Sequence, residues 1–134
     1  MDEGADDADQ IRTLIERWAA AVHTGDLATV LADHADDIVM FDVPPPDQGV
    51  RGIDAYRATW PPFFRWQQQA SFDIESLDVV AGDHVGFAFA LLRCGTPEDL
   101  AQTPESRLRL TIGLVKREGR WVVTHEHHSF VHRD

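Results

Sequence analysis

Apolar positions near the start of the chain recur with the spacing of an α-helix. After Asp9 one apolar stripe contains Ile11, Leu14, Ile15, Trp18, Ala21 and Val22, and the pattern stops at Thr24-Gly25. Asp26 can cap a short second helix. The segment 38–43, apolar except at Asp42, predicts a strand, which the prolines at 44–46 must stop because proline donates no hydrogen bond to a ladder. A third helix is predicted to open at 52–54 and to be broken or kinked at Pro61-Pro62.

The second half of the chain has the alternating pattern of strands. Residues 71–80, 84–94, 106–117 and 120–131 are separated by turns or a polar loop, and a slip in the first of them suggests a β-bulge. The element order is therefore helix, helix, strand, helix and a four-stranded meander. This order predicts a single α+β domain over residues 1–134, a curved antiparallel sheet wrapped around N-terminal helices, with an acidic tail at residues 1–8.

One predicted strand is apolar on both faces. The segment Phe87-Ala88-Phe89-Ala90-Leu91-Leu92 leaves neither face suited to free contact with water. One face would meet the helices, and the other needs a cover, for which a second copy of the chain is the simplest source. We therefore expect a homodimer.

The composition excludes several classes of protein but does not identify a function. The net charge of −11 and the lack of a basic stripe argue against a nucleic-acid partner. A single cysteine, Cys94, excludes an internal disulfide framework and suits a reducing compartment. The first residues do not resemble a signal peptide, and no apolar run reaches the ~18–20 residues of a membrane span. The expectation is a cytoplasmic protein that contacts no membrane.

The last strand and the first strand carry the candidate catalytic groups. Period-two alternation places His125 and His127 on one face with Trp121, Val123 and Ser129, and it sends Glu126 and His128 to the opposite face, toward an interface or solvent. Asp42 follows the apolar residues 39–41, so it would become a stronger base inside an apolar cavity, or else bond the backbone of the proline turn. His125 and His127 could then hold or protonate a substrate carbonyl, with Asp42 as the base.

Large side chains near these groups are candidates for a pocket wall. An aromatic band around the third helix would supply core or rim packing, and it could also reach a ligand. The candidate substrate-binding residues are Trp18, Met40, Tyr56, Trp60, Phe64, Phe89 and Ser129.

Three strings along the chain resemble one known superfamily. They are Phe41-Asp42 before Pro44-Pro45-Pro46, then residues 52–57 with Trp60 and Phe63-Phe64, and finally residues 121–129. Their order is similar to the SnoaL-like branch of the ketosteroid isomerase-like (nuclear transport factor 2-like) superfamily. This resemblance implies a cone-shaped sheet folded around a long helix, an apolar pocket at the open end, frequent dimers, and an acid or base on the early strand. It does not define a reaction.

Three functional hypotheses remain open from the sequence. The preferred one is a cofactor-free acid–base enzyme, of isomerase, lyase or cyclase type, acting on a small apolar carbonyl-containing molecule. The second is a non-catalytic ligand-binding or assembly domain of the same fold. The third is a metal-dependent enzyme in which His125 and His127 are ligands, although no firm third and fourth ligand is apparent.

Overall fold

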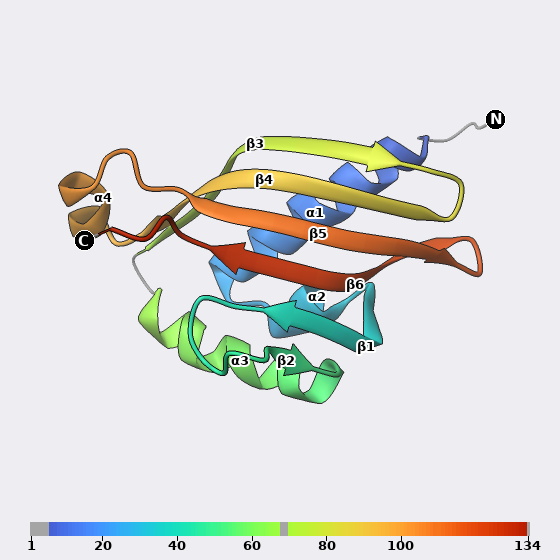
Figure 1. Ribbon diagram of the computed structural model, residues 1–134, viewed down its shortest axis with the longest axis horizontal. Coiled ribbons are helices and arrows are strands. Elements are labelled where there is room, and N and C mark those ends of the chain that lie inside the picture. The colour runs from blue at the N-terminus through green and yellow to red at the C-terminus, as the bar shows by residue number, and fades with distance from the viewer. Residues whose placement is uncertain (1–5, 68–69, 134) are drawn as a thin grey trace.

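The computed structural model describes residues 6–67 and 70–133, and it shows helices packed on one face of a curved, open sheet (Figure 1). Helix α1 (Asp7–Thr24) is capped by Asp6 and ends at Gly25, which has the left-handed φ of 78° that glycine adopts without strain. Helix α2 (Leu27–Leu31) is capped by Asp26, as predicted. Helix α3 (Ile53–Trp66) lies beside the first strand. The predicted α+β class is confirmed.

The sheet has six strands in the order β2-β1-β6-β5-β4-β3. The four later strands are β3 (Ser71–Ala81), β4 (Val85–Gly95), β5 (Leu108–Arg117) and β6 (Arg120–Ser129), and they form the predicted antiparallel meander. The bulge predicted in β3 is present, between Ile74 and Ser76. Strand β1 (His34–Phe41) pairs in parallel with β6, and the short β2 (Val50–Arg51) completes the edge. The parallel pair brings the end of β1 next to the C-terminal part of β6.

The core lies between the inner face of the sheet and the helices. Burial of α1 matches the sequence pattern, because every residue of its predicted apolar stripe is buried. The sheet contributes alternate side chains, among them Leu108, Leu110, Ile112 and Leu114 of β5. In β4 the small residues Ala88 and Ala90 face the core while the larger Phe87 and Phe89 face outward.

Three local predictions need correction. Helix α3 is not broken at Pro61 and Pro62, although prolines remove two backbone donors, because aromatic residues on both sides of them pack together and hold the segment. A short helix, α4 (Pro97–Gln102), replaces the predicted loop, and a capping box between Thr96 and Asp99 begins it. Helix α1 also begins within the stretch predicted as an acidic tail, of which residues 1–5 lie outside the described residues.

A β-bulge in β6 changes which of its side chains face the core. Gly113 of β5 pairs with His125, but the next residue, Leu114, pairs with Val123, so Thr124 is the extra residue. One extra residue reverses the alternation beyond it. Trp121 and Val123 are buried as predicted, and after the bulge the buried residues are Glu126 and His128. The predicted inward orientation of His125 and His127 is therefore wrong.

No helix within residues 6–67 and 70–133 is long and apolar enough to cross a membrane. The cytoplasmic location stays a prediction.

Candidate functional site

A cavity of about 520 Å³ opens between helix α3 and the ends of the strands. Its volume falls within the range of small-molecule pockets, ~300–1,000 Å³. Most of its wall is apolar, and polar side chains border it from α3, β4, β6 and the residue after β1. The lining residues are Asp42, Val43, Pro44, Pro45, Val50, Thr59, Trp60, Pro62, Phe63, Trp66, Phe72, Cys94, Leu108, His128 and Phe130.

Asp42 and His128 reach this cavity from neighbouring strands. The parallel register pairs Met40 with Glu126 and Phe41 with His127, and one further step places Asp42 beside His128. Both side chains lie on the inner face, because Met40 and Glu126, two residues earlier on each strand, are buried there. One carboxylate oxygen of Asp42 accepts a hydrogen bond from the backbone N–H of Val43 at 2.8 Å. A carboxylate and an imidazole thus border one apolar cavity.

Behind His128 lies a buried network centred on Glu126. The Glu126 carboxylate is hydrogen-bonded to Nε2 of His128 at 3.0 Å and to Nε2 of His34 at 2.8 Å. It also accepts the Tyr56 hydroxyl at 2.7 Å, and Tyr56 in turn accepts Nε1–H of Trp18 at 3.2 Å. Glu126 is fully buried, so these partners replace its hydration.

The network sets the ionisation of its members. Burial alone would raise the pKa of Glu126, but hydrogen bonds from His128 and His34 and the charges of both rings lower that pKa to about 2. For His128, burial opposes the imidazolium, while the hydrogen bond and charge of Glu126 and the charge of Asp42 outweigh it and raise the pKa. The pKa of His34 is raised in the same way, against its burial, by Glu126. Burial raises the pKa of the Cys94 thiol to about 12, with a further contribution from Asp42.

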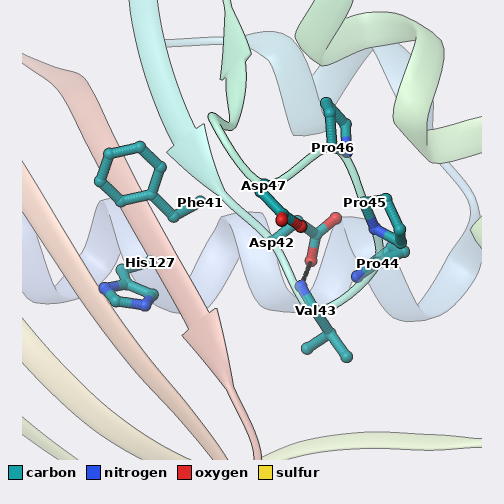
Figure 2. A pocket seen from close by; sticks show the side chains of 8 residues that line it. All are labelled: Phe41, Asp42, Val43, Pro44, Pro45, Pro46, Asp47 and His127. Atoms are coloured by element: carbon teal, nitrogen blue, oxygen red, sulfur yellow. Dashed lines mark hydrogen bonds between the residues drawn. The ribbon is translucent and has the colours of Figure 1, made fainter.

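His127 borders a second, more open depression of about 430 Å³ together with Asp42 and the proline turn. Figure 2 shows the His127 ring on the Phe41 side of β1, and the carboxylate of Asp42 turned toward Val43 and the prolines. The rings of His125 and His127 both pack edge-on against Phe41, on the outer face of the sheet. Asp42 and His127 therefore do not converge on one enclosed point.

The predicted pocket residues divide into three groups. Asp42 and Trp60 line the cavity. Trp18, Met40 and Tyr56 are buried in the core behind it, and Phe64 packs against the core. The residues on the outer face are Phe89, Ser129, His125 and His127.

Sequence reasoning assigned His128 and Glu126 to the wrong face and did not select His34. The extra residue of the bulge, Thr124, is of a type common in regular strands, so the sequence of β6 carried no signal for it. His34 precedes the predicted strand and belongs to no periodic pattern, so nothing local marked it.

The metal hypothesis has no ligand set in the part of the chain that the structure describes. No group of three or more histidine, cysteine, aspartate or glutamate side chains is arranged there to hold a metal ion. His125 is instead hydrogen-bonded through Nδ1 to the backbone oxygen of Val39 at 2.7 Å.

Comparisons with known proteins agree with this architecture. The family model of the SnoaL-like domain matches residues 11–133. An NTF2-like protein of unknown function from Pseudomonas putida KT2440 is 35% identical, with a TM-score of 0.81 over 91% of this chain and 84% of that chain. A comparison with curated proteins found no match.

More distant solved structures share the fold. A putative ketosteroid isomerase from Shewanella frigidimarina is 17% identical, with a TM-score of 0.72 over 87% of this chain and 92% of that chain. A protein with a cystatin-like fold from Caulobacter vibrioides is 20% identical, with a TM-score of 0.76 over 94% of this chain and 90% of that chain.

Proposed function

The chain belongs to the SnoaL-like domain family, and on that premise we propose that it is a cofactor-free acid–base enzyme acting on a small apolar carbonyl compound. The reaction would be of the isomerase, lyase or cyclase type. The observation that supports this proposal is the entry of Asp42 and His128 into the same apolar cavity from adjacent strands. His128 takes the acid role that the sequence suggested for His127 and His125.

The two groups suit proton transfer next to a carbonyl. The Asp42 carboxylate would remove a proton from the carbon beside the carbonyl, and the His128 imidazolium would donate to the developing enolate oxygen. The raised pKa of His128 favours the protonated ring that this donation needs. The aromatic and proline walls of the cavity exclude water, which strengthens the attraction between the imidazolium and the enolate.

Isotope exchange tests the proposal without knowledge of the natural substrate. A panel of small apolar ketones in D2O would be followed by NMR for enzyme-dependent loss of protons next to the carbonyl. Asp42→Asn and His128→Gln should each reduce the exchange rate by ~10²–10⁴-fold, the usual contribution of an acid or base. His127→Gln is the matched control, because the same change on the outer face should leave the rate unchanged. Exchange that persists in Asp42→Asn would refute the assignment.

The ligand-binding alternative is favoured by one specific observation. Asp42 already accepts a hydrogen bond from the backbone N–H of Val43, as a structural turn residue does. If the protein only binds, ketones will quench the fluorescence of Trp60 or Trp66, which line the cavity, with no exchange in any variant.

We also propose that a second copy of the chain covers the outer face of the sheet. Val85, Phe87, Phe89 and Leu91 of β4 are 64%, 47%, 42% and 42% exposed. Their direct partners on β5 are Val115, Gly113, Thr111 and Arg109. On β3, Asp78 lies opposite Phe89, so the two charged residues next to this apolar group have opposite signs. In a chain of net charge −11, an apolar face whose neighbouring charges are of opposite sign is where two copies can meet with little repulsion between like charges.

A further inference from the structure

The buried network behind the cavity is built from four elements. Trp18 belongs to α1, His34 begins β1, Tyr56 belongs to α3, and Glu126 and His128 belong to β6. Of these five residues, His128 alone lines the cavity. The side chain of His34 is 1% exposed and that of Glu126 is fully buried, so a ligand in the cavity touches neither.

Hydrogen-bond geometry defines the protonation of His34. Its Nδ1 lies 2.8 Å from the backbone oxygen of Ala32, and its Nε2 lies 2.8 Å from Oε2 of Glu126. The Tyr56 hydroxyl also lies 3.1 Å from Nε2, but it donates its one proton to Oε2 of Glu126. A carbonyl oxygen and an ionised carboxylate oxygen both accept, which places a proton on each ring nitrogen. His34 is therefore a buried imidazolium, and its ring stacks on Tyr56 with centroids 5.1 Å apart.

This charge changes what Glu126 can do to His128. Oε2 of Glu126 is already engaged by the His34 imidazolium and by the Tyr56 hydroxyl, which leaves Oε1 for Nε2 of His128. Nε2 of His128 therefore carries a proton, and its Nδ1 has no hydrogen-bond partner among those found for the described residues. The positive charge of His34 offsets the negative charge of Glu126. Glu126 therefore orients the His128 ring but raises the pKa of His128 less than a lone carboxylate would.

We propose that His34 is a positioning residue, a buried imidazolium that neutralises Glu126 so that His128 keeps its proton on Nε2 and exchanges the proton on Nδ1 with a ligand in the cavity. The inference rests on the catalytic role proposed above for His128.

The other groups that surround His128 come from the end of β1 and from β4, α1, β5 and α3. Asp42 at the end of β1 and Cys94 on β4 border the same cavity, and the Trp18 ring of α1 packs edge-on against His128 at 6.2 Å. On β5 the neighbour of His128 is Leu110, which carries no charge. Tyr56 of α3 reaches Glu126 rather than His128. If the charge of His34 is removed, no cation in the network opposes Asp42 and Glu126, and these two carboxylates raise the pKa of His128 further.

Nitrogen-15 NMR of histidine ring nitrogens in the full chain tests the proposal without a substrate. In the wild-type protein at pH 7 we expect protons on both ring nitrogens of His34 and a proton on Nε2 of His128. In His34→Gln the midpoint of the His128 titration should move to higher pH by about one unit, the size expected when a nearby like charge is removed. His127→Gln, on the outer face, is the control and should leave the midpoint unchanged. Circular dichroism establishes that each variant is folded.

Two results would overturn the proposal. One is a singly protonated, neutral His34 ring in the wild-type protein at pH 7. The other is an unchanged His128 midpoint in folded His34→Gln. If that variant does not fold, Tyr56→Phe serves instead, because loss of one hydrogen-bond donor to Glu126 should move the His128 midpoint in the same direction by less. If the histidine spectra are as expected but no ketone exchanges its protons, the proposed function is refuted and the protonation of His34 is still established.

Discussion

Replacing Glu126 with glutamine keeps the shape of this buried side chain and removes its charge. The carboxylate accepts three hydrogen bonds, from His34, Tyr56 and His128. The glutamine amide has only one oxygen to accept these three hydrogen bonds. Its NH2 group would face one of the same donor groups, and two donors cannot form a hydrogen bond with each other. The buried His34 imidazolium loses its counter-charge at the same time.

The size of the effect follows from the ionisation of Glu126. The pKa of Glu126 falls from an ordinary 4.5 to about 2 in the folded protein. One pKa unit corresponds to ~1.4 kcal/mol, so the ionised carboxylate contributes about 3 kcal/mol to the free energy of unfolding. Breaking a buried ion pair by removing one partner typically costs ~3–5 kcal/mol, which agrees with that value.

The loss should depend on pH with a definite sign. The lowered pKa of Glu126 contributes stability above pH 4.5, and this contribution disappears as the pH falls toward about 2. The raised pKa values of His34 and His128 contribute stability that is complete below their ordinary 6.5 and is lost as the pH rises through the raised values. The difference between wild type and Glu126→Gln should therefore be largest between pH 4.5 and 6.5.

Urea unfolding at a series of pH values and one protein concentration measures this difference. Glu75→Gln is the matched control, since Glu75 forms a partly exposed ion pair with Arg107 at 2.6 Å. Exposed pairs contribute ~0–1 kcal/mol, so this control should change the free energy of unfolding little. A loss in Glu126→Gln no greater than in Glu75→Gln, or a loss that does not vary with pH, would show that the buried network is not ionised.

Two further predictions concern the outer face and the cavity. Sedimentation at micromolar concentration should show a dimer, which the substitution Phe89→Glu should dissociate. The control Thr13→Glu, at an exposed position of α1, should leave the dimer intact. A monomeric wild-type protein would contradict the proposed interface. The pKa of the Cys94 thiol, about 12, lies three units above its ordinary 9.0. Because the thiolate is the reactive form, Cys94 at pH 8 should react with a thiol-specific disulfide reagent about a thousandfold more slowly in the folded than in the urea-unfolded chain. Equal reaction rates before and after unfolding would show that the thiol is not shielded.

Much of the architecture was predictable because it depends on local periodicity. The apolar stripe of α1 and the alternation of β5 each identify an element and its buried face without reference to the rest of the chain. The caps at Asp26 and Gly25 are likewise local, since each depends on one residue and its own backbone. The α+β class and the meander follow from the order of such elements.

The candidate site depended on information that a single strand does not carry. The sequence of β6 is compatible with two orientations of its histidines, and the choice is made by the pairing of Gly113 with His125 and of Leu114 with Val123. The parallel pairing of β1 with β6, between segments about 85 residues apart, then brings Asp42 beside His128 and His34 against Glu126.

The sequence by itself therefore determined the elements, the charge, the apolar outer strand and the presence of Asp42 at the end of the first strand. Tertiary structure alone decided which histidines face the cavity, because one extra residue in a strand reverses every side chain beyond it. It also decided that Glu126 is buried and ionised, because the two imidazoles and the hydroxyl that compensate its charge come from β1, α3 and β6. A buried carboxylate is tolerated only where such partners meet, and only the folded chain brings them together.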